Sequence, residues 1–460
     1  MSGISGYDFT GIVEQMVASY RLPADQMIKT ENKLTAQKDA WREVNTSLKS
    51  LNDALTNLYY ASTWAASKTS TSNQNLLTAS STAVAIKGAY NINIANTAQA
   101  QTVVSSLNFA DQTSAIVPLT PGKFDITVGG VTKSISVVAG DSLTTLAASI
   151  NNAKAGVTAS IIQDGAGYKL AIITEKTGLA NVATFTNDVT TPGVIESLGL
   201  DASLVTTQPA LDAHITINGI SVTSSTNTVT TAIPGVTLNL IGTGDVSLNV
   251  SQDNSVAQKA AQDFIDKYNS VMDLITKDLS YNKETKETGK LFGDQTLQGI
   301  QARLRRIVTA TQNISSEPYL TLSSIGIMTV SAADAKLTLD TAKFNKAMEE
   351  NPQSVANLFG APAGGVTPDK TPATAQGLAN VLKAYLKPMV EYDGAMSKKQ
   401  DNFAKQLKDI DTRITNFEAR VSSYQDMLKK KFSSLETLLT QLNQQSSWLT
   451  SQVTSMNKSA

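Results

Sequence analysis

The residues that could carry catalytic or metal chemistry are few and widely separated. The chain of 460 residues contains no cysteine and a single histidine, His214. Without cysteine there are no disulfides, thiolate metal sites or cysteine nucleophiles. His214 follows Asp212, but one imidazole and one carboxylate are too few ligands for a usual metal site. We therefore expect neither a bound metal nor a histidine-based triad, and we interpret His214 as a strand-edge surface residue.

Two other patterns have both a chemical and a plain interpretation. The sequence Asp-Gly-Ala-Gly at 164–167 lacks the helix and the lysine that follow in a P-loop, so a β-turn is predicted. Arg303, Arg305 and Arg306 could contact phosphate, although a solvated helix face or a subunit contact is favoured. No hydrolase motif such as G-x-S-x-G occurs. We expect no catalytic residue, no cofactor and no enzymatic activity.

The clearest spacing in the sequence is apolar and lies near the C-terminus. Aliphatic residues occupy every seventh position of one register: Leu407, Ile414, Val421, Leu428, Leu435, Leu442 and Leu449. A companion register holds Phe403, Ile410, Phe417, Tyr424 and Leu438, interrupted by Lys431 and Gln445. Two apolar positions in seven place a seam along one side of a long helix, which winds against a partner helix.

A matching pattern lies at the other end of the chain. Its seam residues are Met27, Leu34, Trp41, Leu48 and Leu55, with Val44, Leu51 and Leu58 on the companion register. A shorter helical pattern covers 9–20. We expect Leu22-Pro23 to separate it from a second helix over 24–60, because proline lacks an N–H and disfavours helix at the preceding residue.

Two uses of these seams stay open. The terminal helices could pack only on each other within one chain, or they could assemble with other copies or another protein. The C-terminal segment carries further apolar residues off its seam, namely Phe432, Leu439, Trp448 and Met456. One partner helix would not easily cover them all, so this surplus favours assembly.

The apolar period changes from seven to two in the middle of the chain. Alternating segments begin at 84–86 and 92–94 and continue to 246–250, separated by glycine-containing turns. This pattern predicts half-buried strands in antiparallel sheets, with one helix capped by Asp141 or Ser142. The segment 76–254 has six lysines, no arginine and eleven acidic residues, a formal charge of −5. Such an acidic surface with few aromatic residues does not suit nucleic-acid binding.

The order helix, strands, helix indicates a β-rich block inserted into a helical stem. The predicted fold class is α+β multidomain, with long coiled-coil terminal helices, a helical stem, and an inserted antiparallel β-rich head of two subdomains. The expected domains are terminal helices at 1–42 and 418–460, the stem at 43–75 and 255–417, one head subdomain at 76–106 and 205–254, and an outer head subdomain at 107–204.

No targeting or membrane segment is expected. The N-terminal residues lack a basic region followed by an apolar core, and no run of about 18 apolar residues occurs. The net charge of −1 provides no field that would attract nucleic acid or an anionic membrane. If the protein leaves the cell, it needs a route that cleaves no signal peptide.

Six segments, in this order, resemble one family. They are IVEQMVASYRLPADQM with KLTAQKDAWREVNTSLKSLNDAL, GAYNINIANTAQAQTVVS, DSLTTLAASINNAKAGVTASIIQDGAGYKLAIIT, DAHITINGISVTSSTNTVTTAIPGVTLNL, LSSIGI with KLTLDTAKFNKAMEENPQSVANLF, and KKKFSSLETLLTQLNQQSSWLTSQVTSMNKS. Over nearly its whole length the chain resembles the flagellar filament cap proteins, also called hook-associated protein 2. Tyr20 and Thr97 depart from that family, which usually has an acidic residue and a leucine there.

The resemblance implies a function and partners. It implies a homo-oligomeric ring, expected to be a pentamer within a range of about four to six copies, at the distal tip of the flagellar filament. Such a ring retains exported flagellin and promotes its folding and polymerisation. The implied partners are flagellin, the hook–filament junction protein, the flagellar type III export apparatus, and a cytoplasmic chaperone that covers Leu435, Leu438, Leu442 and Trp448 before export. The alternative is a surface adhesin that binds host glycan or mucin through the acidic β head.

Overall fold

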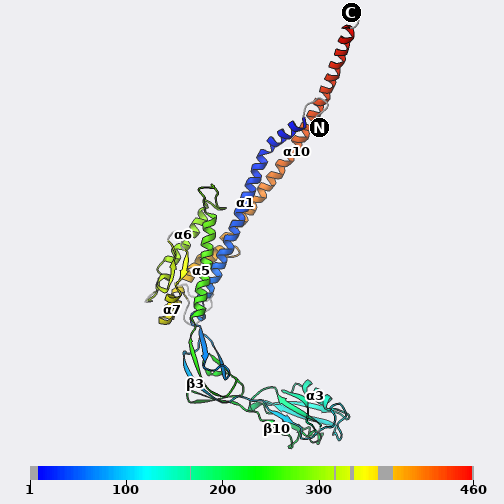
Figure 1. Ribbon diagram of the computed structural model, residues 1–460, viewed down its shortest axis with the longest axis vertical. Helices are drawn as coiled ribbons and strands as arrows, with labels where there is room; N and C mark the ends of the chain where they lie inside the picture. Colours follow the sequence, from blue (N-terminus) through cyan, green and yellow to red (C-terminus); the bar gives the residue numbers. More distant parts are fainter. Residues whose placement is uncertain (1–8, 166, 315–316, 332–335, 361–376, 458–460) are drawn as a thin grey trace. The chain divides into compact units, whose positions relative to one another are not determined.

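The computed structural model describes residues 9–165, 167–314, 317–331, 336–360 and 377–457 (Figure 1). The chain forms two compact units. The helical unit comprises Met1–Trp64 and Ala257–Ala460, and the β unit comprises Ala65–Val256. The predicted α+β class, with antiparallel sheets inserted between helical segments, is confirmed. The boundaries that the sequence suggests within each unit stay predictions.

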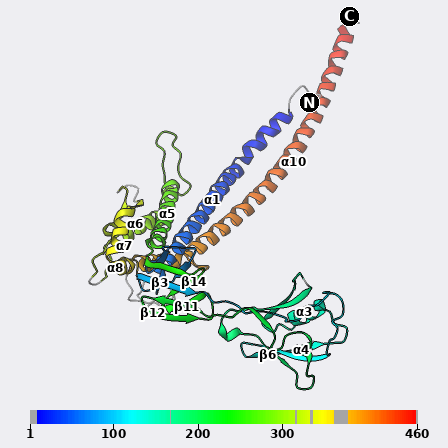
Figure 2. The same cartoon turned by 60° about the horizontal axis from the view of Figure 1, so that its bottom comes forward.

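The first helix, α1 (Phe9–Tyr59), is continuous and lies beside α10 (Ala395–Asn457), as Figures 1 and 2 show. The expected interruption at Leu22-Pro23 is therefore wrong, since Pro23 lies inside α1. An internal proline costs about 3 kcal/mol, because a hydrogen bond is lost and the ring clashes with a carbonyl. Packing on α10 offsets this cost: Ala24 is fully buried, and the Tyr20 ring stacks on that of Tyr424, with centroids 4.4 Å apart.

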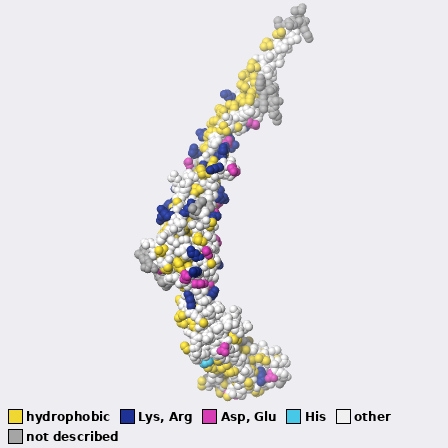
Figure 3. Space-filling view, turned by 60° about the vertical axis from the view of Figure 1, so that its left-hand side comes forward, with side chains coloured by type: hydrophobic (Ala, Val, Ile, Leu, Met, Phe, Trp, Pro, Cys, Tyr) yellow, Lys and Arg dark blue, Asp and Glu magenta, His cyan; other side chains and the backbone are white. Residues whose placement is uncertain are grey.

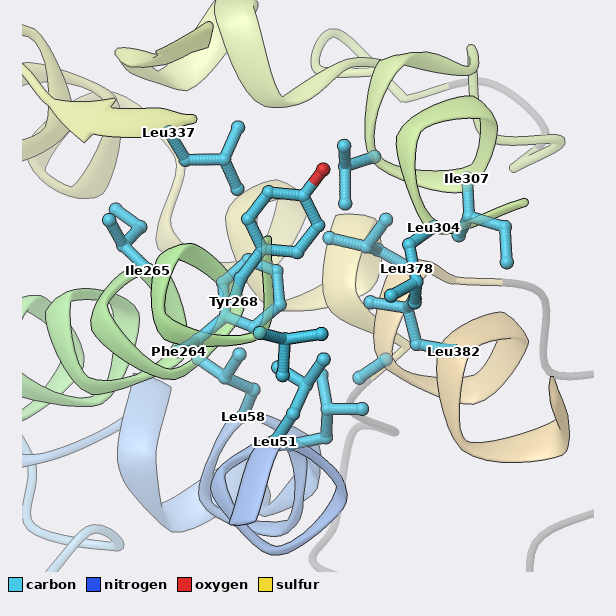
Figure 4. Close-up of a cluster of buried hydrophobic side chains, with 14 of the residues drawn as sticks. Leu51, Leu58, Phe264, Ile265, Tyr268, Leu304, Ile307, Leu337, Leu378 and Leu382 are labelled. Atoms are coloured by element: carbon cyan, nitrogen blue, oxygen red, sulfur yellow. The ribbon is translucent and has the colours of Figure 1, made fainter. Parts of the chain in front are cut away.

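Shorter elements complete the core of the helical unit. They are α2 (Ala61–Trp64), α5 (Asn254–Asp278), α6 (Gln295–Thr309), a 3-10 turn (Leu322–Ile325), the hairpin β16 (Ile327–Thr329) and β17 (Leu337–Leu339), α7 (Thr341–Glu350), α8 (Pro352–Phe359) and α9 (Leu378–Val390). Figure 4 shows side chains from different helices meeting in this core, including Phe264 and Tyr268 of α5, Leu304 of α6, Leu382 of α9 and Leu58 of α1. Burying these large side chains stabilises the unit, and each is 0% exposed.

The last helical segment of the chain is interrupted just before α10, at Gly394 and not at Pro388. Pro388 lies inside α9, whereas residues 391–394 separate α9 from α10. A Cβ atom on Gly394 would lie 2.6 Å from the carbonyl oxygen of Met389, so a larger residue does not fit without movement. The glycine therefore sets the point where α10 begins.

The β unit is built from four antiparallel sheets. Its strands are β1 (Ser67–Thr71), β2 (Leu77–Ser81), β3 (Gly88–Asn96), β4 (Thr102–Val104), β5 (Gly122–Val128), β6 (Val131–Val137), β7 (Val157–Gln163), β8 (Tyr168–Thr174), β9 (Thr184–Asn187), β10 (Val205–Gln208), β11 (Ala213–Ile217), β12 (Ile220–Ser224), β13 (Thr228–Ile233), β14 (Val236–Leu240) and β15 (Gly244–Gln252). The strand orders are β1-β15-β3-β11-β12, β13-β14-β2, β10-β4-β8-β7 and β6-β5-β9. The short helices are α3 (Leu143–Asn152), a 3-10 turn (Leu179–Asn181) and α4 (Val194–Ser197).

Two separate hydrophobic clusters lie within the β unit, as expected for a head of two subdomains. One gathers the first two sheets around residues such as Ile92 and Leu238. The other gathers the last two sheets and α3 around residues such as Phe124 and Leu146. Ser142 caps α3 as predicted, because its hydroxyl accepts a hydrogen bond from the Thr145 amide.

Two details of the β unit differ from the sequence interpretation. Val84 and Ile86 were expected in a strand, but they lie outside any strand, 76% and 61% exposed, and Ala85 between them is buried instead. The reason is a tight turn, in which the Ala85 amide donates to the Thr82 carbonyl at 3.0 Å. Conversely, no strand was expected at Ser67–Thr71, yet β1 pairs with β15 along its whole length.

The buried phenol of Tyr268 generates a stability prediction. Burial raises the pKa of Tyr268 to about 12, and its Oη atom has no hydrogen-bond partner among the described residues. Replacing Tyr268 by Phe removes an unpaired polar atom, so Tyr268→Phe is expected to raise stability by about 1 kcal/mol, measured as an increase in Tm. Tyr319→Phe is the matched control, because the Tyr319 hydroxyl donates to Glu350 at 3.2 Å and its loss should not stabilise the fold. A lower Tm for the Tyr268 variant would contradict this interpretation.

Candidate assembly surface

The two terminal helices form an antiparallel pair. Along α1 the contacts run from Phe9 on Phe432, with ring centroids 5.5 Å apart, to Arg21 on Glu418, at 2.7 Å. Residue numbers on α10 therefore fall as those on α1 rise. Aromatic rings carry much of this contact, and Arg21–Glu418 is a half-exposed ion pair of modest strength.

A lysine fixes the base of α10 to two other helices. The ammonium of Lys399 lies 3.8 Å from the centroid of the Trp41 ring in α1 and 3.0 Å from Oδ2 of Asp294. Asp294 also caps α6, since its Oδ1 accepts hydrogen bonds from the amides of Thr296 and Leu297. This single side chain therefore joins α10, α1 and α6 by a cation–π contact and an ion pair.

The environment of Asp294 favours its charged form. Burial alone would raise the pKa of this carboxyl, and it is the largest single influence. The Lys399 ammonium and the amides of Leu297 and Thr296 together outweigh burial, so the pKa of Asp294 lies below its ordinary value. Sequence reasoning placed Trp41 on the seam but missed Asp294 and Lys399. An aspartate just before the apolar pattern of α6 was a readable capping signal, whereas nothing in the sequence marks Lys399.

The predicted seam residues fall into three groups along the pair. Trp41, Leu48, Leu55, Val421 and Leu428 are buried; Met27, Leu34, Leu407 and Ile414 are half-buried; Leu435, Leu442 and Leu449 are exposed. On α10 the seam is therefore most buried at Val421 and Leu428 and is exposed from Leu435 onward. The role of these residues in assembly stays a prediction, but the structure shows which of them one chain covers by itself.

The end of α10 has no α1 segment beside it among the described residues. Because Phe432 already lies against Phe9, the first described residue of α1, about 25 further residues extend α10 by roughly 37 Å. Figure 3 shows apolar side chains gathered along this end of the chain. Leu438 and Trp448, the other residues of the implied chaperone site, are 53% and 62% exposed. We call residues 437–457 the tail of α10.

The tail differs in composition from the rest of α10. It contains no Asp, Glu, Lys or Arg, whereas charged residues are frequent between Lys398 and Glu436. Of the additional apolar residues, Phe432 and Leu439 are half-buried and Trp448 is exposed, while the Met456 side chain lies outside the described part. An exposed apolar stripe on an uncharged helix is a typical docking surface.

The other chemical candidates do not form a site. His214 is an exposed residue at the start of β11, 3.3 Å from the Ser221 hydroxyl, as expected for a surface residue at the edge of a strand, and β11 itself lies between β3 and β12. The Asp164 amide donates to the Gly167 carbonyl at 2.8 Å, as in the predicted turn. Arg303 lies 5.9 Å from the Tyr385 ring. Within the described residues, no three acidic or histidine side chains gather as metal ligands, and no helix has the length and hydropathy to cross a membrane.

Comparison with known proteins identifies the family. The family described as Flagellar hook-associated protein 2 C-terminus matches residues 210–444, and Flagellar hook-associated protein 2 N-terminus matches residues 5–101. The chain belongs to the flagellar hook-associated protein 2 family. Within it, residues 123–176 match the Flagellin hook IN motif. This motif spans β5 to β8, so it lies entirely in the β unit.

Two relatives in this family match nearly the whole chain. Flagellar hook-associated protein 2 of Escherichia coli strain K12 is 31% identical over 97% of this chain and 96% of its own length. The B-type protein of Pseudomonas aeruginosa strain PAO1 is 24% identical over 99% of this chain and 97% of its own. The crystal structure of the D1-D2-D3 domains of the flagellar cap protein FliD from Escherichia coli is 30% identical, with a TM-score of 0.64 over 79% of this chain and 99% of that one.

The lysine contact at the base of α10 can be tested by Lys399→Met. Losing the cation–π contact and the ion pair is expected to destabilise the helical unit by about 2 kcal/mol at pH 7. Because the pKa of Asp294 is depressed, the ion pair contributes stability above the ordinary aspartate pKa of about 3.9, and this is lost as the pH falls through the folded pKa. Thermal unfolding from pH 7 to pH 3 should therefore show the gap between variant and parent narrowing below about pH 4.

The neighbouring Lys398 supplies the control for this experiment. Lys398 is exposed and lies on the same turn of α10. Lys398→Met makes the same change of side chain without removing either contact, so its Tm should stay close to that of the parent. Equal effects of the two variants at every pH would show that Lys399 has no special role.

Proposed function

We propose that this chain forms the homo-oligomeric cap at the distal tip of a flagellar filament. There it retains exported flagellin and promotes the folding and polymerisation of flagellin as the filament elongates. Its family and its likeness over nearly the whole chain to a flagellar cap protein support this function. The structural observation that carries the proposal is the uncharged tail of α10, which α1 leaves uncovered. The family is one of structural proteins, and we assign this member no enzymatic activity.

The tail provides a physical mechanism for attachment. An isolated helix is only marginally stable in water, and packing supplies most of its stability. We infer that the tail of α10 docks among helices of similar character at the filament end and gains its order there. Affinity gained by ordering is moderate, because part of the contact energy is spent on the lost entropy. A cap that must move as each flagellin subunit is added needs contacts of that kind.

The same exposed surface is the proposed binding site for further partners. Before export, a cytoplasmic chaperone would cover Leu435, Leu438, Leu442 and Trp448, which are all exposed here. The chain would then pass through the flagellar type III apparatus, for which the absence of cysteine is suitable because no disulfide can form before the passage. At the tip we propose a ring, with the pentamer as our preferred count, that sits beyond the hook–filament junction protein and contacts flagellin. The adhesin alternative receives no support from the comparisons.

A pair of substitutions on the exposed part of the α10 seam tests attachment. Leu435→Asp with Leu442→Asp places two carboxylates on the seam, where docking would have to bury them at a cost of several kcal/mol. We expect the amount of protein on purified filament tips to fall at least about tenfold, which corresponds to about 1.4 kcal/mol. The fold of the β unit should be unchanged by circular dichroism.

Thr437→Asp with Gln444→Asp is the matched control for the tail. These positions have the same spacing and are exposed, but they lie off the seam, so the same added charge should leave attachment nearly unchanged. Normal filament growth with the Leu435 and Leu442 variant would contradict the proposed docking surface.

A cellular experiment tests the function as a whole. In cells that lack this chain, exported flagellin should accumulate as monomer in the medium while filaments are short or absent. Purified protein added to such cells should restore filament growth. Filaments of normal length without the protein would refute the cap function.

A further inference from the structure

A pocket on the helical unit lies away from the α1–α10 seam. It has a volume of about 490 Å³ and lies between the C-terminal half of α1 and helix α9, with the residues after α9 at its rim. This is the size range of pockets that hold small ligands or single residues of a partner. Tyr392 forms part of the rim and is 98% exposed. Tyrosines in such positions are frequent anchors for a bound group.

Three residues of α1 on or near this pocket carry an unpaired, buried oxygen atom. Asn45, Asn52 and Tyr59 recur every seventh residue on α1, and each has a side-chain oxygen that is buried and lacks a hydrogen-bond partner among the described residues. Asn52 and Tyr59 belong to the pocket wall. Tyr59 is only 2% exposed, so its hydroxyl is costly to leave unpaired. A ligand that supplied the missing partners would remove this cost.

The ionised groups around the pocket are mixed in sign. Lys49, Lys383 and Lys387 line it together with two acidic residues, Asp53 and Glu391. Lys383 donates to the Thr56 hydroxyl at 3.0 Å, and its ammonium lies 5.9 Å from the centroid of the Tyr59 ring. Lys387 pairs with Glu391 at 3.6 Å. The small positive excess suits a group with one negative charge, whereas a phosphate dianion would meet the two carboxylates.

The missing partners define the chemistry of a ligand. The Tyr59 hydroxyl can donate a hydrogen bond, and burial raises the pKa of Tyr59, which keeps the phenol protonated. The Asn52 carbonyl oxygen needs a donor. We propose that the pocket binds a carboxylate with an N–H group beside it, as in the last residue of a polypeptide or in a free amino acid. Tyr59 and the lysines hold the carboxylate, and Asn52 accepts from the N–H.

The experiment uses the full chain and four probes. They are acetyl-dialanine with a free carboxylate, the same peptide with a C-terminal amide, free alanine, and sodium acetate, each titrated by calorimetry or ligand-observed NMR. We expect the peptide acid to bind at least about tenfold more tightly than the amide and than acetate, because a hydrogen bond to a charged group contributes more than one to a neutral group. Free alanine distinguishes the two possible ligands. If alanine binds as tightly as the peptide acid, the ligand is a free amino acid; if it binds more weakly, the ligand is the end of a polypeptide.

Two conservative variants tie the binding to the pocket. Tyr59→Phe removes one oxygen atom and is expected to lower the affinity for the peptide acid at least about fivefold. Tyr60→Phe removes the same atom from the neighbouring residue, which is 36% exposed and not part of the pocket wall, and should leave binding within about twofold. Lys49→Met, at an exposed position on the rim, should also weaken binding. No binding of the acid, equal binding of acid and amide, equal binding of acetate, or no effect of Tyr59→Phe would each overturn the proposal.

Discussion

The structure depends on two apolar seams of unequal length. In the antiparallel pair, the first described residue of α1 already lies against Phe432, while α10 continues to Asn457. The seam positions of α10 up to Leu428 are buried or half-buried, whereas Leu435, Leu442 and Leu449 are exposed. One continuous pattern thus serves two purposes, because its covered part stabilises the fold and its uncovered part remains available for other molecules.

The covered part of the pair is held firmly at its base. Lys399 links α10 to Trp41 and to Asp294, and Asp294 in turn caps α6. The helix begins at Ala395, directly after Gly394, so this link lies on the second turn of α10. A helix fixed at its first turns and uncovered at its last can bind at its far end without disturbing the core. This arrangement suits a protein whose ends must attach and detach while the remainder stays folded.

The sequence predicted those features that repeat. The heptad spacing predicted the terminal helices, and the period-two spacing predicted most strands. Both periods can be read because packing imposes them on many residues at once. Features set by a single contact were missed. Pro23 remains in a helix because Tyr20 and Ala24 pack on α10. Tyr20 is also one of the two positions at which the sequence departs from the residue expected for the cap family, an acidic one.

Other misses have the same origin. The strand β1 consists of Ser, Lys and Thr, so it carries no apolar alternation, and its contacts with β15 and β2 determine it. Conversely, Val84 and Ile86 alternate without forming a strand. The pocket beside Tyr59 could not be predicted from the sequence for a further reason. Its two walls come from α1 and α9, which are more than three hundred residues apart in the chain. No local pattern encodes such a meeting.

The composition of the tail limits how it can choose partners. In coiled coils, charges beside the seam usually determine partner and orientation, but residues 437–457 carry none. Its many Ser, Thr and Asn residues are also weak helix formers, so the helix there depends on packing more than α10 does elsewhere. Selectivity must then come from the shapes of leucine and tryptophan side chains and from adaptable amide and hydroxyl groups. In the cap that we propose, such a surface would accept several helical partners in succession, and identical tails on neighbouring copies of the ring would not repel one another.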